Sequence, residues 1–136
     1  MNVARVALVC LCLSCLVIGA QATVAPHAFY TGFPFGRGWV ELLPPYNEHL
    51  IRDVGGFYLA FAILFAWAAV TLARELVVPL CVAYAVDAVL HGVFHVLHLD
   101  GFTAADAIAQ TVGLAAVLAL PLLAIRYAQP KGARPL

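Results

Sequence analysis

The sequence has little charge for its length. Only 10% of its 136 residues are charged, whereas 65% are hydrophobic. Soluble domains carry about a quarter charged residues, so this composition excludes an ordinary soluble domain. The formal net charge is zero. This balance excludes the basic surface of a nucleic-acid-binding protein, and we therefore expect no nucleic-acid partner.

Several motifs of soluble enzymes are also missing. The chain contains no phosphate-binding glycine loop, no dinucleotide-binding fingerprint and no nucleophile elbow. Their absence excludes nucleotide-driven transport by this chain alone. We find no internal repeat either, and four short helices without a repeat do not suggest a carrier that works by alternating access.

The four cysteines, Cys10, Cys12, Cys15 and Cys81, all lie in apolar stretches. This placement does not indicate a disulfide framework. Cys12 and Cys15 form a C-x-x-C pair, and soft thiolates could hold copper or zinc. Because no histidine or acid accompanies them, we favour the interpretation that they are small side chains packed in a helix.

The sequence does contain four long stretches with almost no charge. A helix needs about 20 residues to cross the hydrocarbon core of a membrane, and each stretch is long enough. We therefore predict one all-α domain, a polytopic membrane protein built as an up-down bundle of four transmembrane helices. The predicted helices cover residues 4–25, 47–73, 76–98 and 103–127, with an external loop over residues 26–46.

The ends of these stretches carry local signals. Asn47 and Thr103 are expected to cap the second and fourth helices, the latter in a capping box with Asp106. The pattern Ala20-Gln21-Ala22 resembles a signal-peptide cleavage site. Because the apolar stretch continues beyond it to Ala25, we favour an uncleaved first helix. Glycines and prolines in the long loop argue against a regular element there, and its aromatic residues suit the membrane interface.

The basic residues divide unequally between the two ends of the predicted bundle. The larger group is Arg5, Arg74, Arg126, Lys131 and Arg134, and the smaller group is Arg37 and Arg52. Cytoplasmic segments of membrane proteins carry the excess of Lys and Arg. We therefore expect both termini in the cytoplasm and the long loop outside.

The third stretch contains the most informative polar pattern. Asp87, His91, His95 and His98 fall within an arc of about 80° on a helix, and Tyr84 lies on the same stripe. Such residues are too costly to face lipid, so the stripe should face the bundle or a wet cavity. With this helix running outward, the stripe extends from the outer interface to about 16 Å deeper.

The neighbouring helices place further polar residues at the same outer level. On the second helix, Glu48 with Arg52 and His49 with Asp53 are spaced as i,i+4 pairs. Gly55, Gly56 and Ala60 follow, and small residues let another backbone approach closely. The fourth helix adds Asp106 and Gln110. The candidate site is therefore a polar cluster formed by Glu48, His49, Arg52, Asp53, Tyr84, Asp87, His91, His95, His98, Asp106 and Gln110.

Three functional interpretations fit this cluster. In the first, His91 and His95 ligate a transition metal, and His98, Asp87, Glu48 or His49 complete the shell. In the second, a histidine is an axial haem ligand, with His49 as a partner from the facing helix. In the third, the cluster binds a quinone or lipid headgroup, or relays protons. A structural interpretation competes with all three, since buried polar residues such as Arg52 and Asp53 also hold helices together.

Three segments carry a resemblance to a known group: Pro26-His27-Ala28-Phe29-Tyr30, residues 46–56 and residues 91–100. They resemble uncharacterised four-helix membrane proteins of actinobacteria, which are loosely similar to the DoxX-like group. The resemblance extends from about Pro26 to the end of the fourth helix. It implies a four-helix bundle in the bacterial cytoplasmic membrane and a loose link with quinone and thiol redox systems, although this chain lacks a soluble thiol motif.

We therefore expect an integral membrane protein whose His/acid cluster near the outer face binds a small ligand, metal or quinone. The protein would take part in a redox or envelope process, and the sequence does not decide whether it is an enzyme. The expected cofactor is a transition metal, haem or quinone. The expected partners are membrane lipid and other membrane subunits or further copies of the chain. The alternative is a structural accessory subunit without its own activity.

Overall fold

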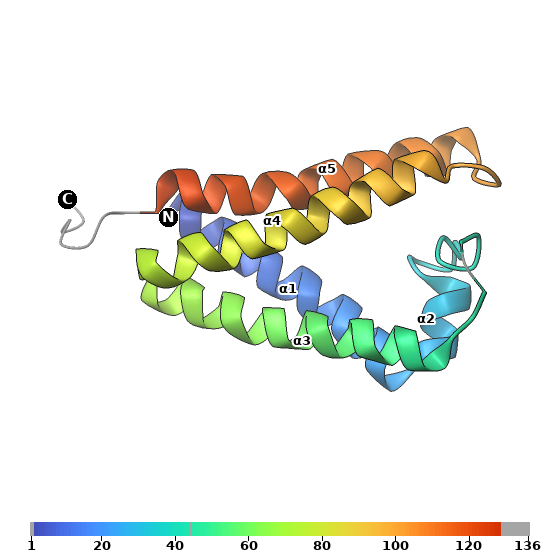
Figure 1. Ribbon diagram of the computed structural model, residues 1–136, viewed down its shortest axis with the longest axis horizontal. Helices are drawn as coiled ribbons and strands as arrows, with labels where there is room; N and C mark the ends of the chain where they lie inside the picture. Colours follow the sequence, from blue (N-terminus) through green and yellow to red (C-terminus); the bar gives the residue numbers. More distant parts are fainter. Residues whose placement is uncertain (1, 44, 129–136) are drawn as a thin grey trace.

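The computed structural model describes residues 2–43 and 45–128, and every regular element within them is a helix. A short helix, α2, lies at one end of four long ones, and both ends of the described chain lie at the other (Figure 1). The helices are α1 (Val3–Val24), α2 (Pro26–Gly32), α3 (Glu48–Thr71), α4 (Arg74–Leu97) and α5 (Ala104–Tyr127).

The four long helices are each long and apolar enough to cross a membrane. The chain is therefore a multi-pass membrane protein of the all-α class, and the predicted fold class is confirmed. The two predicted caps are also present. Asn47 accepts a hydrogen bond from the Leu50 amide at 3.2 Å, and Thr103 accepts one from the Asp106 amide at 3.2 Å. Both caps satisfy amides that the first turn of a helix leaves without a partner.

The loop after α1 differs from the prediction, because its first seven residues form α2. Pro26 stands in the first turn of α2, where its fixed φ and missing N–H suit a helix start. Phe29 is buried and packs against Phe33, with ring centroids 4.8 Å apart. The helix ends at Gly32. The irregular structure predicted from the glycines and prolines of this loop therefore begins only after α2.

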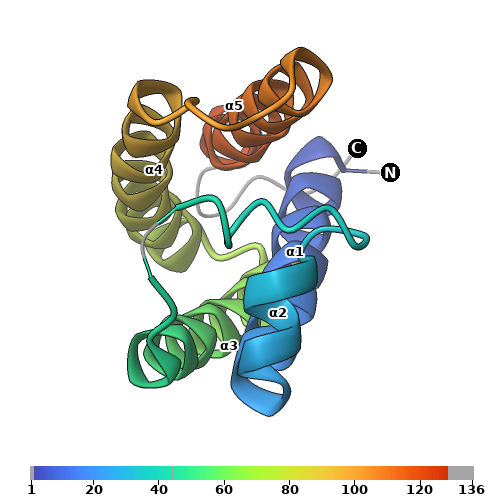
Figure 2. The same cartoon turned by 90° about the vertical axis from the view of Figure 1, so that its right-hand side faces the viewer.

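The long helices form an antiparallel ring that is closed on three of its four sides. The closed sides are the extensive packing of α1 on α3, of α4 on α5 and of α1 on α5. Helices α3 and α4 are joined by only two residues, Leu72 and Ala73, yet their backbones stay close only near this connection and diverge toward the other end (Figures 1 and 2). We call the side between α3 and α4 the open side.

Close packing of α1 on α3 depends on two glycines. A Cβ added at Gly55 would lie 2.8 Å from the backbone nitrogen of Thr23, and one at Gly19 would lie 2.9 Å from the carbonyl oxygen of Gly55. A Cβ at Gly56 would meet nothing within 4 Å. The predicted close approach of a neighbouring backbone therefore occurs at Gly55, and its partner is α1. At the other end of the same pair, the Arg5 guanidinium donates a hydrogen bond to the Ala69 carbonyl at 3.0 Å.

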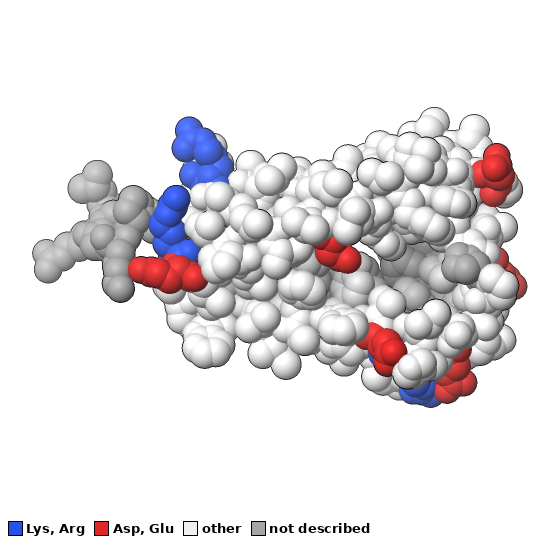
Figure 3. Space-filling model, viewed as in Figure 1, with Lys and Arg blue, Asp and Glu red and all other residues white. Residues whose placement is uncertain are grey.

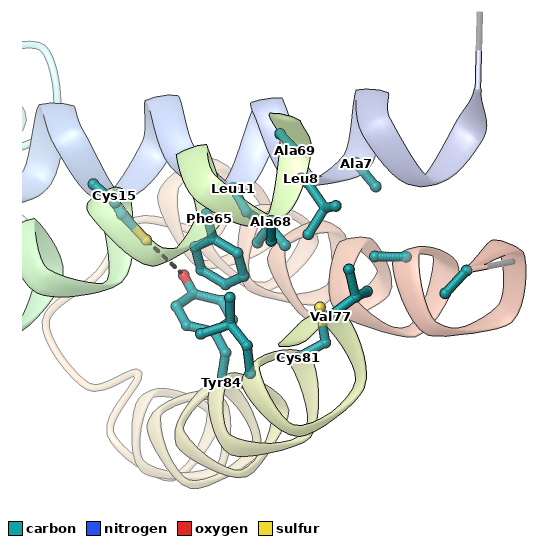
Figure 4. Packing of buried hydrophobic residues seen from close by; sticks show 14 residues of the cluster. Ala7, Leu8, Leu11, Cys15, Phe65, Ala68, Ala69, Val77, Cys81 and Tyr84 are labelled. Atoms are coloured by element: carbon teal, nitrogen blue, oxygen red, sulfur yellow. Dashed lines mark hydrogen bonds between the residues drawn. The ribbon is translucent and has the colours of Figure 1, made fainter. Parts of the chain in front are cut away.

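The hydrophobic core lies in the half of the ring nearest the termini. Figure 4 shows side chains of all four long helices meeting there. Leu8, Phe65 and Val77 are fully buried. At the border of this core, the Cys15 thiol donates a hydrogen bond to the Tyr84 hydroxyl at 3.7 Å (Figure 4). Cys15 and Cys81 are buried free cysteines, as the interpretation of packed small side chains predicts, whereas Cys10 is exposed.

Candidate functional site

The polar residues at the α2 end of the ring are divided among three places. They were predicted to form one cluster from three helices. Because α3 and α4 diverge at this end, the polar residues on the first turns of α3 do not reach the histidines of α4.

The first group lies on the first turns of α3. The Arg52 guanidinium contacts Glu48 at 2.9 Å, and the His49 ring contacts Asp53 at 3.3 Å. Both predicted i,i+4 pairs are therefore present. Arg52 also donates to the Thr23 carbonyl and so ties α3 to the end of α1.

Tyr46 extends this first group into the loop. Its hydroxyl donates a hydrogen bond to Glu48 at 3.3 Å, and its ring lies edge-on to those of His27 and Tyr30. Desolvation, and then the negative charge of Glu48, raise the pKa of Tyr46 above its ordinary value. The phenol therefore stays protonated and remains the donor in this contact. The group is exposed and its charges are paired, which suits a structural role.

The second group surrounds Asp106 at the start of α5. Its carboxylate accepts hydrogen bonds from the Thr103 hydroxyl at 2.7 Å, the Trp39 indole at 3.0 Å and the Arg37 guanidinium. Arg37 and Trp39 belong to the loop after α2, so Asp106 fastens this loop to α5. Trp39 was predicted to lie in an interfacial aromatic belt, and nothing in the sequence predicted its contact or that of Arg37 with Asp106, which join residues 67 and 69 positions apart.

The third group lies between α4 and α5. Gln110 is 3% exposed, and its amide lies beside the His95 ring, but neither amide atom forms a hydrogen bond of good geometry. His95 is 9% exposed, and its Nδ1 atom also has none. The rings of His91 and His95 lie 4.4 Å apart between centroids. Of the five histidines, all of which are within the described residues, His95 alone is buried.

His91 and Asp87 are exposed although they share a face of α4 with the buried Tyr84. This pattern indicates that the edge of the face with Asp87 and His91 is uncovered, whereas the edge with Ala88 and His95 is buried. Figure 3 shows the surface hollowed between α3 and α4, toward the end that carries α2. Asp87 lies close enough to Tyr58 on α3 for its charge to act on that phenol. Tyr84 and Asp87 were predicted members of the polar cluster, whereas Tyr58 was not.

His98 stands apart from the third group. Its Nδ1 atom lies 2.7 Å from the Phe94 carbonyl, and its ring stacks on that of Phe94 with centroids 4.1 Å apart. His49 does not belong to the third group either, because its side chain is 82% exposed and pairs with Asp53. The residues brought together are therefore His91, His95 and Gln110, with Asp87 and Tyr84 deeper on the same face.

These residues offer hydrogen-bonding groups and no fixed positive charge. Within the described residues, no three His, Cys, Asp or Glu side chains are gathered so that they could hold a metal ion. His91 and His95 could supply two ligands, whereas protein metal sites ordinarily use three or four. The amide of Gln110 and the imidazole of His95 can instead donate to, and accept from, an uncharged polar ligand.

Comparison with known proteins places the chain in a family without assigning an activity. Residues 3–89 match a family described as a domain of unknown function, DUF4345. The match covers α1, α2, α3 and α4 as far as Val89, and it ends before His91. No curated protein and no solved structure matches the chain. Because the match covers more than half of its residues, the chain belongs to the DUF4345 family.

Proposed function

We propose that this protein binds a small polar ligand through His91, His95 and Gln110, in the service of a redox or envelope process. The observation that carries the proposal is the burial of Gln110 and His95 beside each other, with no hydrogen bond of good geometry at either amide atom of Gln110 or at Nδ1 of His95. A buried polar group with no hydrogen bond costs roughly 1–3 kcal/mol. Three such atoms are gathered in one place, two on Gln110 and one on His95. A ligand that forms hydrogen bonds to them would recover this free energy.

The membrane and the orientation form part of the same proposal. Arg5, Arg74 and Arg126 belong to the ends of helices at which both termini lie, while Arg37 and Arg52 belong to the opposite end. Figure 3 shows basic side chains near the termini and most acidic ones toward the other end. By the positive-inside rule, the termini are cytoplasmic and α2 is external in a bacterial cytoplasmic membrane. Lys131 and Arg134, which support the same assignment, lie outside the described residues.

The experiment is purification in a mild detergent, followed by mass spectrometry of co-purifying small molecules, elemental analysis and an optical spectrum. We would compare the wild type with Gln110→Leu and His95→Leu. His49→Leu is the matched control, because it removes an exposed histidine that belongs to another group. We expect one compound in stoichiometric amount that both site variants lose and the control keeps. If all four proteins carried the same compounds, no ligand would be bound at this site and the proposal would fail.

The bound species could be a metal ion or a haem, because His91 and His95 lie side by side and could both ligate it. The same purification tests this interpretation directly. A stoichiometric metal, or the optical band of a haem, that disappears in His95→Leu would support it. Its coordination would then have to be completed by another copy of the chain or by a partner subunit, since no third ligand is gathered near these histidines within the described residues.

The second candidate is a structural accessory subunit, and a specific observation favours it. Arg52 joins Glu48 to the end of α1, so the polar residues of α3 hold the ring together. If this were the whole role of the polar residues, Arg52→Gln would lower accumulation of the protein in the membrane. Gln110→Leu would leave both accumulation and phenotype unchanged. A Gln110→Leu protein that accumulates normally but lacks activity in the cell would favour ligand binding.

A further inference from the structure

We infer that the ligand of His91, His95 and Gln110 is a quinone with a long apolar tail, which enters from the lipid through the open side. The inference rests on the proposed binding site and names its ligand class and its route of entry. Three observations carry it: the exposed residues on facing surfaces of α3 and α4, the loop that lies across the α2 end, and the chemistry of the polar groups.

The facing surfaces of α3 and α4 both carry exposed residues. On α3, Val54, Tyr58 and Phe65 share one face. Phe65 is fully buried, Tyr58 is half-buried and Val54 is 46% exposed. On α4, Asp87 and His91 are exposed between the buried Tyr84 and the buried His95, which packs toward α5. The two surfaces therefore bound a groove that is open to the surrounding lipid.

The inner end of this groove is closed by aromatic side chains. The ring of Tyr84 contacts those of Phe61 and Phe65, with centroids 5.3 Å and 5.1 Å apart. The wall on α3 is apolar at Val54 and Phe61 and carries the phenol of Tyr58, while α4 carries the carboxylate of Asp87. Such a groove accommodates an apolar tail beside a polar head, which is the shape of a membrane-borne amphiphile.

At the α2 end of the ring, the described residues after α2 lie across the ring (Figure 2). This segment is fastened on its far side by the contacts of Arg37 and Trp39 with Asp106. A water-borne ligand would have to pass this segment, whereas a lipid-borne ligand meets no such barrier between α3 and α4. The site is therefore reached from the membrane.

The polar groups of the site match an uncharged head. Arg37 is paired with Asp106 and Arg52 with Glu48, and the other described arginines, Arg5, Arg74 and Arg126, lie toward the opposite end. No described cation is thus available to a phosphate, which disfavours a phospholipid headgroup. The amide of Gln110 and the ring N–H of His95 can donate to carbonyl oxygens. A quinone presents carbonyl oxygens on an apolar ring, and its tail suits the groove.

The test uses the full-length protein in phospholipid nanodiscs and a photoreactive benzoquinone that carries an alkyl tail. Labelled peptides are mapped by mass spectrometry, with and without an excess of unlabelled quinone. We compare the wild type with Gln110→Leu, which removes the polar contact, and Val54→Trp, which fills the groove. Ile63→Trp is the matched control, because Ile63 is 69% exposed on another face of α3. Thermal unfolding confirms that each variant is folded.

We expect competed labelling of residues 54–61 and 87–95 in the wild type and in the control. Loss of one hydrogen bond should lower labelling by roughly tenfold in Gln110→Leu, and Val54→Trp should lose it as well. Equal labelling of all four proteins would show partition into lipid alone and would overturn the inference. If the quinone labels nothing while another compound co-purifies and is lost in Gln110→Leu, the proposed site stands and this ligand class is wrong. Unchanged labelling in Val54→Trp alone would overturn entry through the open side.

Discussion

Two adjacent glycines of α3 have opposite surroundings. Gly55 lies against the backbone of Thr23, with only 2.8 Å between a built Cβ and the Thr23 nitrogen, while Gly56 meets nothing within 4 Å. A backbone neighbour cannot swing aside as a flexible side chain can. The same substitution at neighbouring positions should therefore have opposite effects.

We predict that Gly55→Ala destabilises the protein by roughly 1–3 kcal/mol, because the added methyl forces α1 away from α3. Gly56→Ala should be neutral or stabilise by up to about 1 kcal/mol, because alanine favours a helix. Thermal unfolding in detergent, followed by circular dichroism, measures both. If Gly55→Ala unfolded no earlier than Gly56→Ala, the close approach of α1 and α3 would be wrong.

At the residue scale, the sequence was sufficient wherever an interaction is local. The caps at Asn47 and Thr103 and the pairs of Arg52 and His49 involve residues within four positions of each other, so spacing predicts them. The contact of Cys15 with Tyr84 joins residues 69 positions apart. Nothing in the sequence near either residue indicates that contact, because it depends on how the helices assemble.

The segment between α1 and α3 differs most from its prediction. It was predicted as an irregular external loop, but it begins with the helix α2, and the loop after α2 is fastened to α5 through Asp106. Asp106 was correctly placed in a capping box, since that interaction lies within one turn. Its second role, as an anchor for Arg37 and Trp39, requires the loop to fold back across the ring.

We predict that Asp106→Asn loosens this loop and that trypsin then cuts faster after Arg37. An exposed ion pair contributes little, about 0–1 kcal/mol, but the substitution also weakens the contact with Trp39. We therefore expect cleavage to accelerate by roughly three- to tenfold. The rate is measured on protein in detergent micelles by mass spectrometry of the fragments.

Asp100→Asn is the control for this experiment, because Asp100 is an exposed acid in the turn between α4 and α5. It should leave the cleavage rate unchanged. Equal rates for Asp106→Asn and the wild type would mean that the loop is held by contacts other than those of Asp106.

At the scale of the helices, hydrophobic length predicted the four long elements, because the membrane demands that length of any spanning helix. The open side was not predictable in the same way. A two-residue connection ordinarily implies neighbours packed along their length. Here Leu72 adopts a left-handed conformation, with φ at 51°, and α4 leaves at an angle that separates it from α3. The division of the polar residues into three groups follows from this separation.

For the whole molecule, we predict that both termini lie in the cytoplasm. A fluorescent reporter that matures only in the cytoplasm should fluoresce when fused after Leu136. A phosphatase reporter that is active only outside should be active when inserted at Gly36. The reverse pattern would assign the end with Arg5, Arg74 and Arg126 to the outside. It would also place His91 and Gln110 in the cytoplasmic half of the membrane.

The open side also links the protein to the thickness of its membrane. Helices α3, α4 and α5 have 24 residues each, which corresponds to about 36 Å of helix. The hydrocarbon core of a bilayer is about 30 Å thick, so such helices tilt, and they tilt more in a thinner bilayer. Three sides of the ring resist that movement through packed side chains, and the fourth does not. Shorter acyl chains should therefore spread α3 from α4, which spin labels on the two helices would record as a longer distance.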